Sequence, residues 1–147
     1  MKIRPAECKD IPDMIQLLKV LFEIEVDFEF SPEKHHAGLS AVIQDQNCGA
    51  FVALSDNEKL VGMCTAQWVI STATGQKSAW MEDLIVANKY RGNGVGHQLI
   101  EAIQRWAIEQ GCNRIQLVYD LANQPAIEFY EKRNFNHTKL GVFTKPL

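Results

Sequence analysis

The sequence predicts a single α/β domain over residues 1–147, with a mixed, mostly antiparallel sheet flanked by helices. Two helix-period stretches follow a short first strand, and three β-type stretches come next. A strongly amphipathic stretch then separates these from a further strand. The length of 147 residues is that of one domain with a single core. These observations give the element order βααβββαβαββ.

The first half of the chain has clear signals for the start of each element. Asp10 is a residue type that caps helix N-termini, and Ser31 before Pro32 repeats this signal, with proline at the first helical position. The polar residues 55–58 separate two apolar stretches and predict a hairpin turn. The helices expected here are 11–22 and 32–43, and the strands expected are 3–5, 50–54 and 60–70.

The second half continues the alternation of helices and strands. Apolar residues at helical spacing from Val95 to Ala107 predict an amphipathic helix, which Gly111 ends. Asn123 is expected to cap a last helix that ends near Arg133. The strands expected here are 78–86, 114–119, 135–139 and 142–145, the last two as a closing pair.

The composition argues against several classes of protein. A formal net charge of −3 gives no basic surface, so nucleic acid is not an expected partner. The N-terminus lacks the apolar segment of a signal peptide, and no apolar run reaches the roughly 18 residues of a membrane span. The four cysteines are dispersed singly, which predicts buried, reduced thiols in a cytoplasmic protein rather than disulfides or a metal site.

A glycine-rich turn, Arg91-Gly92-Asn93-Gly94-Val95-Gly96, stands between a predicted strand and a predicted helix. Glycine permits positive φ and the close approach of a ligand to the backbone. A helix N-terminus leaves unpaired N–H groups and carries a partial positive charge, which favours anions. The turn therefore predicts a phosphate site, with Arg91 as an added cation.

Two common phosphate-binding motifs do not fit this turn. A P-loop requires Lys-Ser/Thr after its last glycine, whereas Gly96 is followed by His97 and Gln98. A dinucleotide-binding fingerprint requires glycine where His97 stands. Asp120 could serve as its ribose-binding acid, but the 27 residues beyond it are too few for the rest of that fold. A small phosphate-binding domain of another kind remains.

Two motifs resemble the GNAT N-acetyltransferase superfamily, nearest to its members that act on small amines and polyamines. Arg91-x-x-Gly94-x-Gly96, within "MEDLIVANKYRGNGVG", is similar to the Q/R-x-x-G-x-G/A loop that binds the pyrophosphate of acetyl-CoA. The segment "NQPAIEFYEKRNF" at 123–135 resembles the family's N-x-x-A-x-x-F-Y-x-x-x-G-F. Asn134 replaces the family's glycine, but asparagine tolerates the left-handed conformation, so we expect the turn to persist.

The resemblance implies a GNAT-like fold, acetyl-CoA as cosubstrate, and a set of residues that bind it. Backbone groups of one strand would bond the pantetheine arm in a gap between two splayed strands, and the glycine turn would surround the pyrophosphate. Asn123 aligns with a residue that contacts the cofactor, a role compatible with capping its helix. The expected binding residues are Leu84, Ile85, Val86, Arg91, Gly92, Asn93, Gly94, Val95, Gly96, His97 and Asn123.

The resemblance also implies two catalytic residues. Tyr130 aligns with the general acid that protonates the departing thiolate, and the alternative is an aromatic ring packed beside Phe129. An alkylammonium acceptor must lose a proton before it attacks, and polyamine-type members place a glutamate at the Glu82 position near that nitrogen. Asp83 is the reserve base. Strand alternation would place Trp80, Glu82, Leu84 and Val86 on one face, and Met81, Asp83 and Ile85 on the other.

The acceptor is less well defined by the sequence. Phe28 and Phe30 could form an apolar wall of its pocket or anchor their loop to the core. Two functions from different classes remain: an acetyltransferase for a primary amine, and a non-catalytic acyl-CoA-binding regulatory module, either of them compatible with a homodimer. Five acids could favour a cationic small molecule over a peptide, or could form a solvated edge: Glu23, Glu25, Asp27, Glu29 and Glu33.

Overall fold

The computed structural model describes residues 1–24 and 29–147. It has two compact units, Met1–Leu117 and Val118–Leu147, and each is described by itself. The elements are β1 (Lys2–Pro5), η1 (Cys8–Asp10), α1 (Ile11–Phe22), α2 (Pro32–Gln44), β2 (Cys48–Leu54), β3 (Leu60–Ser71), β4 (Gln76–Val86), η2 (Asn88–Tyr90), α3 (Val95–Glu109), β5 (Cys112–Gln116) and α4 (Gln124–Glu131). The predicted α/β class is confirmed, and the single-domain expectation stays a prediction.

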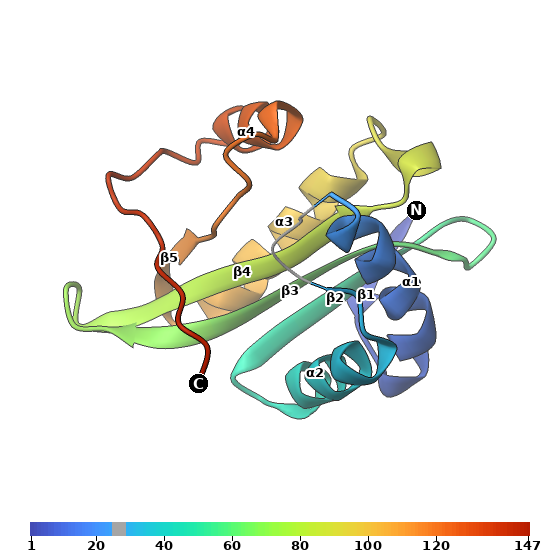
Figure 1. Cartoon of the computed structure of the whole chain (residues 1–147), viewed down its shortest axis with the longest axis horizontal. Coiled ribbons are helices and arrows are strands. Elements are labelled where there is room, and N and C mark those ends of the chain that lie inside the picture. Colours follow the sequence, from blue (N-terminus) through green and yellow to red (C-terminus); the bar gives the residue numbers. More distant parts are fainter. Residues whose placement is uncertain (25–28) are drawn as a thin grey trace. The chain divides into compact units, whose positions relative to one another are not determined.

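The sheet of the first unit has the strand order β1-β2-β3-β4-β5 (Figure 1). The first four strands pair antiparallel, and β5 joins β4 in parallel. The predicted mixed, mostly antiparallel sheet is therefore correct, and each strand lies beside its neighbour in sequence. Strand β5 begins two residues earlier than expected and ends at Gln116.

Helices cover both faces of this sheet, with α1 and α2 on one face and α3 on the other (Figure 1). Successive residues of β3 show the two faces. Met63 packs in a cluster with α1, whereas a Cβ built at Gly62 would lie 3.1 Å from Leu99 of α3. Because strand side chains alternate between faces, Met63 and Gly62 mark the α1 and α3 sides respectively.

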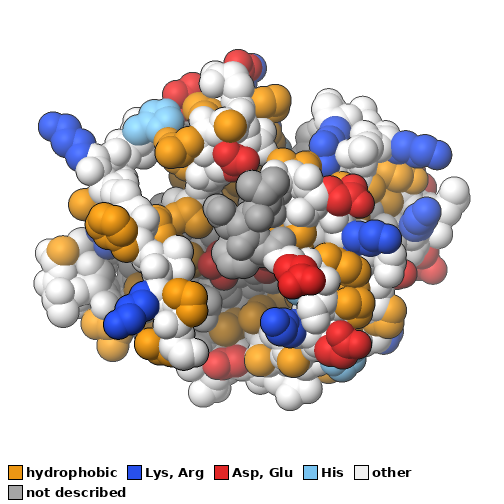
Figure 2. All heavy atoms as spheres, viewed as in Figure 1, with side chains coloured by type: hydrophobic (Ala, Val, Ile, Leu, Met, Phe, Trp, Pro, Cys, Tyr) orange, Lys and Arg blue, Asp and Glu red, His pale blue; other side chains and the backbone are white. Residues whose placement is uncertain are grey.

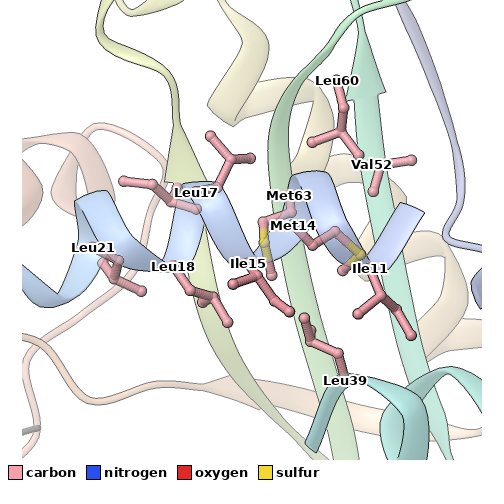
Figure 3. Packing of buried hydrophobic residues seen from close by; sticks show 11 residues of the cluster. Ile11, Met14, Ile15, Leu17, Leu18, Leu21, Leu39, Val52, Leu60 and Met63 are labelled. Carbon is pink, nitrogen blue, oxygen red and sulfur yellow. The ribbon is translucent and has the colours of Figure 1, made fainter. Parts of the chain in front are cut away.

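The core on the α1 side consists of aliphatic and methionine side chains (Figure 3). These side chains come from α1, from Leu39 of α2, and from β2, β3 and β4. Their helical spacing along α1 is the periodicity that predicted the helix. The α1 residues in the cluster are Ile11, Met14, Ile15, Leu17, Leu18 and Leu21.

Asp10 lies at the predicted start of α1 but does not cap it. Its side chain makes no cap hydrogen bond to the helix, and instead its carboxylate accepts from both terminal nitrogens of Arg4, at 2.6 and 2.8 Å. It also accepts from the backbone N–H of Glu7 at 2.8 Å. Ser31 does cap α2, since its hydroxyl accepts from the N–H of Lys34 at 3.5 Å.

In the second unit, the predicted closing strand pair is wrong. Residues 132–147 are all described and form no strand after α4. The apolar pattern of the predicted strands is present, but Val142 and Phe143 are 67% and 104% exposed. A strand needs a neighbour for its backbone groups and a face to bury, and these side chains meet solvent instead.

The cysteines and the surface bear on the expected cellular context. All four cysteines are free thiols, but only Cys64 is buried and Cys8 is exposed, so the expectation of four core thiols is wrong.

On the face shown in Figure 2, basic side chains stand among acidic ones. None of the helices found in residues 1–24 and 29–147 has the length and apolar character of a membrane span.

Candidate active site

The first feature of the site is an irregularity in β4. Met63 of β3 pairs with Ile85, and Thr65 pairs with Glu82, so the single residue Cys64 stands opposite two residues of β4. The extra residue makes a β-bulge, and Asp83 within it has φ 53°. Positive φ is uncommon for a residue other than glycine, although aspartate is among the types that tolerate it.

The bulge places the residues that follow it in β4 on the opposite faces to those predicted relative to Glu82. Ile85 shares the α1-side cluster with its partner Met63, and Glu82 lies on that same face because it pairs with Thr65, two residues from Met63. Val86 pairs with Gly62 and therefore faces α3. The predicted grouping of Glu82 with Val86 is wrong, because strict alternation holds only in a strand of regular register.

The two carboxylates at the bulge have different partners. The Thr65 hydroxyl donates to Oδ2 of Asp83 at 2.8 Å, and the indole N–H of Trp80 donates to Oε1 of Glu82 at 3.2 Å. Asp83 is half-buried, whereas Glu82 keeps contact with solvent. Because Thr65 bonds Asp83 and pairs with Glu82, the bulge brings both acids to one place on the α1 face.

The pKa values of both carboxyl groups are raised above their ordinary values. Loss of surrounding water raises the pKa of Asp83, and the hydrogen bond from Thr65 opposes that rise. Displacement of water also raises the pKa of Glu82, the negative charge of Asp83 raises it further, and the Trp80 hydrogen bond lowers it. Glu82 therefore binds a proton more readily than an ordinary glutamate does.

The pairing of β4 with β5 ends next to the bulge. Their parallel pairing runs from Lys77 and Cys112 to Trp80 and Gln116 and stops there, while β4 continues to Val86. Residues 81–86 of β4 therefore have no β5 partner along this edge. The resemblance implied a gap between two splayed strands at this place, and that gap stays a prediction. Ile85 lies in the core through its side chain, so its backbone is the part available at this edge.

The glycine turn follows directly. Gly92 and Gly94 have φ of 76° and 77°, and a Cβ at either position would meet no atom within 4 Å. The positive φ explains why both residues are glycine. The absence of side chains here leaves the backbone of the turn open to a ligand. The first bond within α3 runs from Gln98 N to Gly94 O at 3.1 Å. The N–H groups of residues 95–97 precede this bond, as a helix N-terminal anion site requires.

The side chains around the turn differ in burial and in their contacts. Val95 is buried and seats the start of α3 against β3, while Asn93 is exposed. The Nε of Arg91 donates to the carbonyl of Val86 at 2.8 Å, which ties the turn to the end of β4. His97 is exposed and its Nε2 lies 3.6 Å from Oε1 of Glu101. An anion at this turn would meet backbone N–H groups.

Asn123 and Tyr130 belong to the second unit. Oδ1 of Asn123 accepts from the N–H of Ala126 at 3.2 Å, so its predicted capping role is confirmed. The half-buried Tyr130 ring lies edge-on to Phe129 and Phe135, with centroids 5.4 and 5.6 Å away. Asn134 has φ 63°, as expected for the position where the family has glycine. The roles of Asn123 in cofactor binding and of Tyr130 in catalysis stay predictions.

The acidic segment between the first two helices is described only in part. Glu23, Glu29 and Glu33 are exposed, whereas Glu25, Asp27 and Phe28 lie outside the described residues. Phe30 packs against the core cluster, which fits the anchoring alternative. His35 accepts the N–H of Ser31 on its Nε2 at 3.0 Å and stacks on Phe22.

The first unit thus brings together the bulge carboxylates, the open edge of β4 and the glycine turn, all on β4 or directly after it. Sequence reasoning missed Thr65 and Trp80, which hold the two carboxylates, because nothing in the sequence marks a register shift. Among the described residues, no three His, Cys, Asp or Glu side chains gather as metal ligands.

Comparisons with known proteins agree with this arrangement. The acetyltransferase (GNAT) family model matches residues 11–135. The uncharacterized N-acetyltransferase YobR of Bacillus subtilis (strain 168) is 30% identical over 107 residues, covering 73% of this chain and 41% of YobR. The aminoglycoside N(6')-acetyltransferase type 1 of Serratia marcescens is 27% identical over 116 residues, covering 77% of this chain and 80% of that enzyme.

A solved structure matches the chain over nearly its whole length. The crystal structure of a transcriptional regulator from Bacillus halodurans C-125 superposes with a TM-score of 0.85 at 28% identity, covering 98% of both chains. This chain matches only part of the length of several relatives. It covers 41% of YobR, and 53% and 42% of two other relatives, which is about half or less of each.

Proposed function

Because this chain belongs to the acetyltransferase (GNAT) family, we propose that it transfers the acetyl group of acetyl-CoA to a primary amine, by direct attack in a ternary complex. One observation carries this proposal: a single strand, β4, holds a pair of carboxylates at its bulge, an unpaired edge beyond it, and the glycine turn at its end. Base, pantetheine edge and phosphate site then follow one another along the strand.

The residues present fit acetyl-CoA. The pyrophosphate would meet the N–H groups of the turn at residues 92–97, where two positive-φ glycines leave open space. The backbone of Leu84, Ile85 and Val86 offers hydrogen-bonding groups on an edge that β5 does not use. When bound, acetyl-CoA supplies the thioester that the amine attacks.

Glu82 is proposed to accept the proton of the acceptor ammonium, directly or through a water, or to anchor that ammonium. Its raised pKa suits a base that must take a proton near neutral pH. Because a base must be ionised to act, activity should fall as the pH drops through this pKa. Tyr130 is proposed to give a proton to the departing thiolate, and Asn123 to contact the cofactor.

The proposed acceptor is a cationic small molecule. Support comes from the exposed acids Glu23, Glu29 and Glu33, and from the similarity to an aminoglycoside acetyltransferase, an enzyme for a small molecule. A cytoplasmic location is proposed from the free thiols.

The deciding assay measures release of CoA thiol by the purified protein with acetyl-CoA and a panel of amines. The panel contains spermidine, diamines, lysine analogues, aminoglycosides and peptides. We expect multiply charged amines to be preferred. Faster turnover of neutral or peptide amines would keep the transferase and contradict the cationic acceptor.

Variants assign the two catalytic roles. Tyr130→Phe should lower kcat by about 100-fold or more, the usual contribution of a positioned acid, with unchanged acetyl-CoA affinity. Glu82→Gln should lower kcat/KM by a similar factor. Tyr119→Phe, which alters another tyrosine of the second unit, and Glu109→Gln, at the exposed end of α3, are the matched controls. Full activity of Tyr130→Phe would remove that residue from the mechanism.

A second candidate is a non-catalytic acyl-CoA-binding module. It is favoured by the near-complete superposition on a protein described as a transcriptional regulator. This alternative predicts tight acetyl-CoA binding by calorimetry without thiol release for any amine in the panel. Measurable turnover that depends on Glu82 and Tyr130 would exclude it.

A further inference from the structure

The bulge of β4 contains two adjacent carboxylates, and their hydrogen-bond donors differ. The Thr65 hydroxyl lies 2.8 Å from Oδ2 of Asp83, and Thr65 is only 3% exposed. Glu82 instead accepts a longer bond, 3.2 Å, from the indole of Trp80. A donor stabilises the ionised form of the carboxylate that it bonds, so the two acids are not equivalent.

We propose that Thr65 is a positioning residue that determines which carboxylate acts as the base. By donating to Asp83, it favours the ionised form of Asp83 in the left-handed bulge and leaves Glu82 as the group that takes the proton. The acceptor's ammonium would lose its N–H proton to a Glu82 oxygen and become the neutral nucleophile. This inference rests on the proposed function.

The geometry gives Thr65 this position through the register of the sheet. Thr65 pairs directly with Glu82, and side chains of directly paired residues leave the same face about 5 Å apart at Cβ. Its hydroxyl nevertheless reaches Asp83, because the extra residue at the bulge brings Asp83 into range. In a regular strand Asp83 would point to the other face, away from both Thr65 and Glu82.

Within residues 1–24 and 29–147, few other charged groups compete with these two carboxyls. Burial raises the pKa of the Cys64 thiol well above its ordinary value, so this neighbour on β3 stays neutral. Helix α1 packs on the same face through its apolar side chains, and its charged Asp13 and Lys19 are exposed. Helix α3 covers the opposite face. Among the described residues, Asp83 is therefore the charge that acts on Glu82.

Carboxyl titration by carbon-13 NMR in the ligand-free protein tests the proposal without turnover. Thr65→Val removes the hydroxyl at nearly constant volume. We expect the two carboxyls to move in opposite directions, with Asp83 titrating at higher pH and Glu82 at lower pH than in the wild type. Thr65→Ser, which keeps a hydroxyl, should restore both titrations.

Asp83→Asn provides a second route if Thr65→Val folds poorly. Removal of the Asp83 charge should also lower the pH at which Glu82 titrates. Because Thr65 acts through Asp83, adding Thr65→Val to Asp83→Asn should give Glu82 no further shift. If Thr65 only stabilised the bulge, Thr65→Val would alter the melting temperature. The Asp83 and Glu82 titrations would then not shift in opposite directions, and the effects of Thr65→Val and Asp83→Asn on Glu82 would add.

The outcomes separate the inference from the proposed function. Unchanged titrations in Thr65→Val, or two carboxyls that shift together, would overturn the inference even if acetyl transfer is observed. Opposed shifts in a protein that acetylates no amine would support the role of Thr65 and reject the proposed chemistry. Where both hold, the acid limb of kcat/KM should move to lower pH in Thr65→Val.

Discussion

Asp83 combines a left-handed backbone with a half-buried charge. Its φ of 53° is a conformation that asparagine adopts as readily, and its carboxylate has the Thr65 hydroxyl as a hydrogen-bond donor. Burial raises its pKa, so the folded protein holds the Asp83 proton more tightly than the unfolded chain. The stability linked to Asp83 is therefore fully present below the unfolded pKa of about 3.9 and is lost as pH rises through the folded pKa.

Asp83→Asn should accordingly stabilise the protein at neutral pH. Asparagine keeps an acceptor for Thr65, suits the positive φ and removes a charge that burial disfavours. We expect a gain of about 1 kcal/mol in the free energy of unfolding at pH 7, and a smaller gain at pH 3. Urea unfolding at the two pH values measures this. A variant that is less stable than the wild type at pH 7 would contradict the electrostatic account.

The Arg4–Asp10 pair shows the opposite case at this scale. The hydrogen bonds from Arg4, and then that from the backbone of Glu7, hold the pKa of Asp10 below its ordinary range. The Asp10 carboxylate thus stabilises the fold above its unfolded pKa, and the contribution is lost only as pH falls through its lower folded value. The sequence marked Asp10 as a helix cap, since its type and position fit, but its partner Arg4 could not be foreseen from local pattern.

At the scale of elements, α3 packs on β2 with almost no spare room. A Cβ at Gly49 would lie 2.7 Å from Cδ2 of Trp106, a rigid indole that cannot move aside. Gly38 is the contrast: it lies within α2, and a Cβ there would meet nothing within 4 Å. Packing therefore requires glycine at position 49, whereas nothing in the packing requires it at position 38.

Gly49→Ala should destabilise the protein by about 1–3 kcal/mol, the usual cost of overpacking. Gly38→Ala should stabilise it by up to about 1 kcal/mol, because alanine is the better helix former and nothing blocks its methyl group. Thermal unfolding of both variants beside the wild type is sufficient. Equal melting temperatures for the two would show that α3 can shift away from β2.

Much of the fold could be predicted from sequence, because its elements carry local signals. The 3.6-residue periodicity marked α1 and α3, Ser31-Pro32 marked the start of α2, and the positive-φ glycines marked the turn before α3. The bulge in β4 could not be predicted, since it depends on the register between β3 and β4. The apolar stretches at 135–139 and 142–145 resembled strands, but only a neighbouring strand can make them so.

At the scale of the whole molecule, the two units differ in how they are held together. The buried hydrophobic residues of the described chain all lie between Ile11 and Ala107, within the first unit, and α4 of the second unit has none. Segments with few buried contacts open more easily than core strands. Residues 118–147 should therefore be the less protected part of the chain.

Hydrogen exchange should reveal this difference and its response to ligand. We expect amides of α4 to exchange faster than those of β3 in the free protein. Saturating acetyl-CoA should slow exchange in residues 91–97 and in 123–130, where the proposed contacts lie, and leave α2 unchanged as the internal control. Protection of 91–97 with no change in 123–130 would argue against the proposed roles of Asn123 and Tyr130.

The thiol of Cys64 stands opposite the bulge, 3.6 Å from the carbonyl oxygen of Glu82. While β3 and β4 remain paired, burial keeps this sulfur protonated and out of reach of an alkylating reagent. Each alkylation of Cys64 must then record one separation of the two strands that carry the bulge. The exposed Cys8 reacts without any such event, so it supplies an internal reference for the reagent. The rate of Cys64 alkylation, followed by mass spectrometry, thus reports how often the candidate catalytic strand separates from β3.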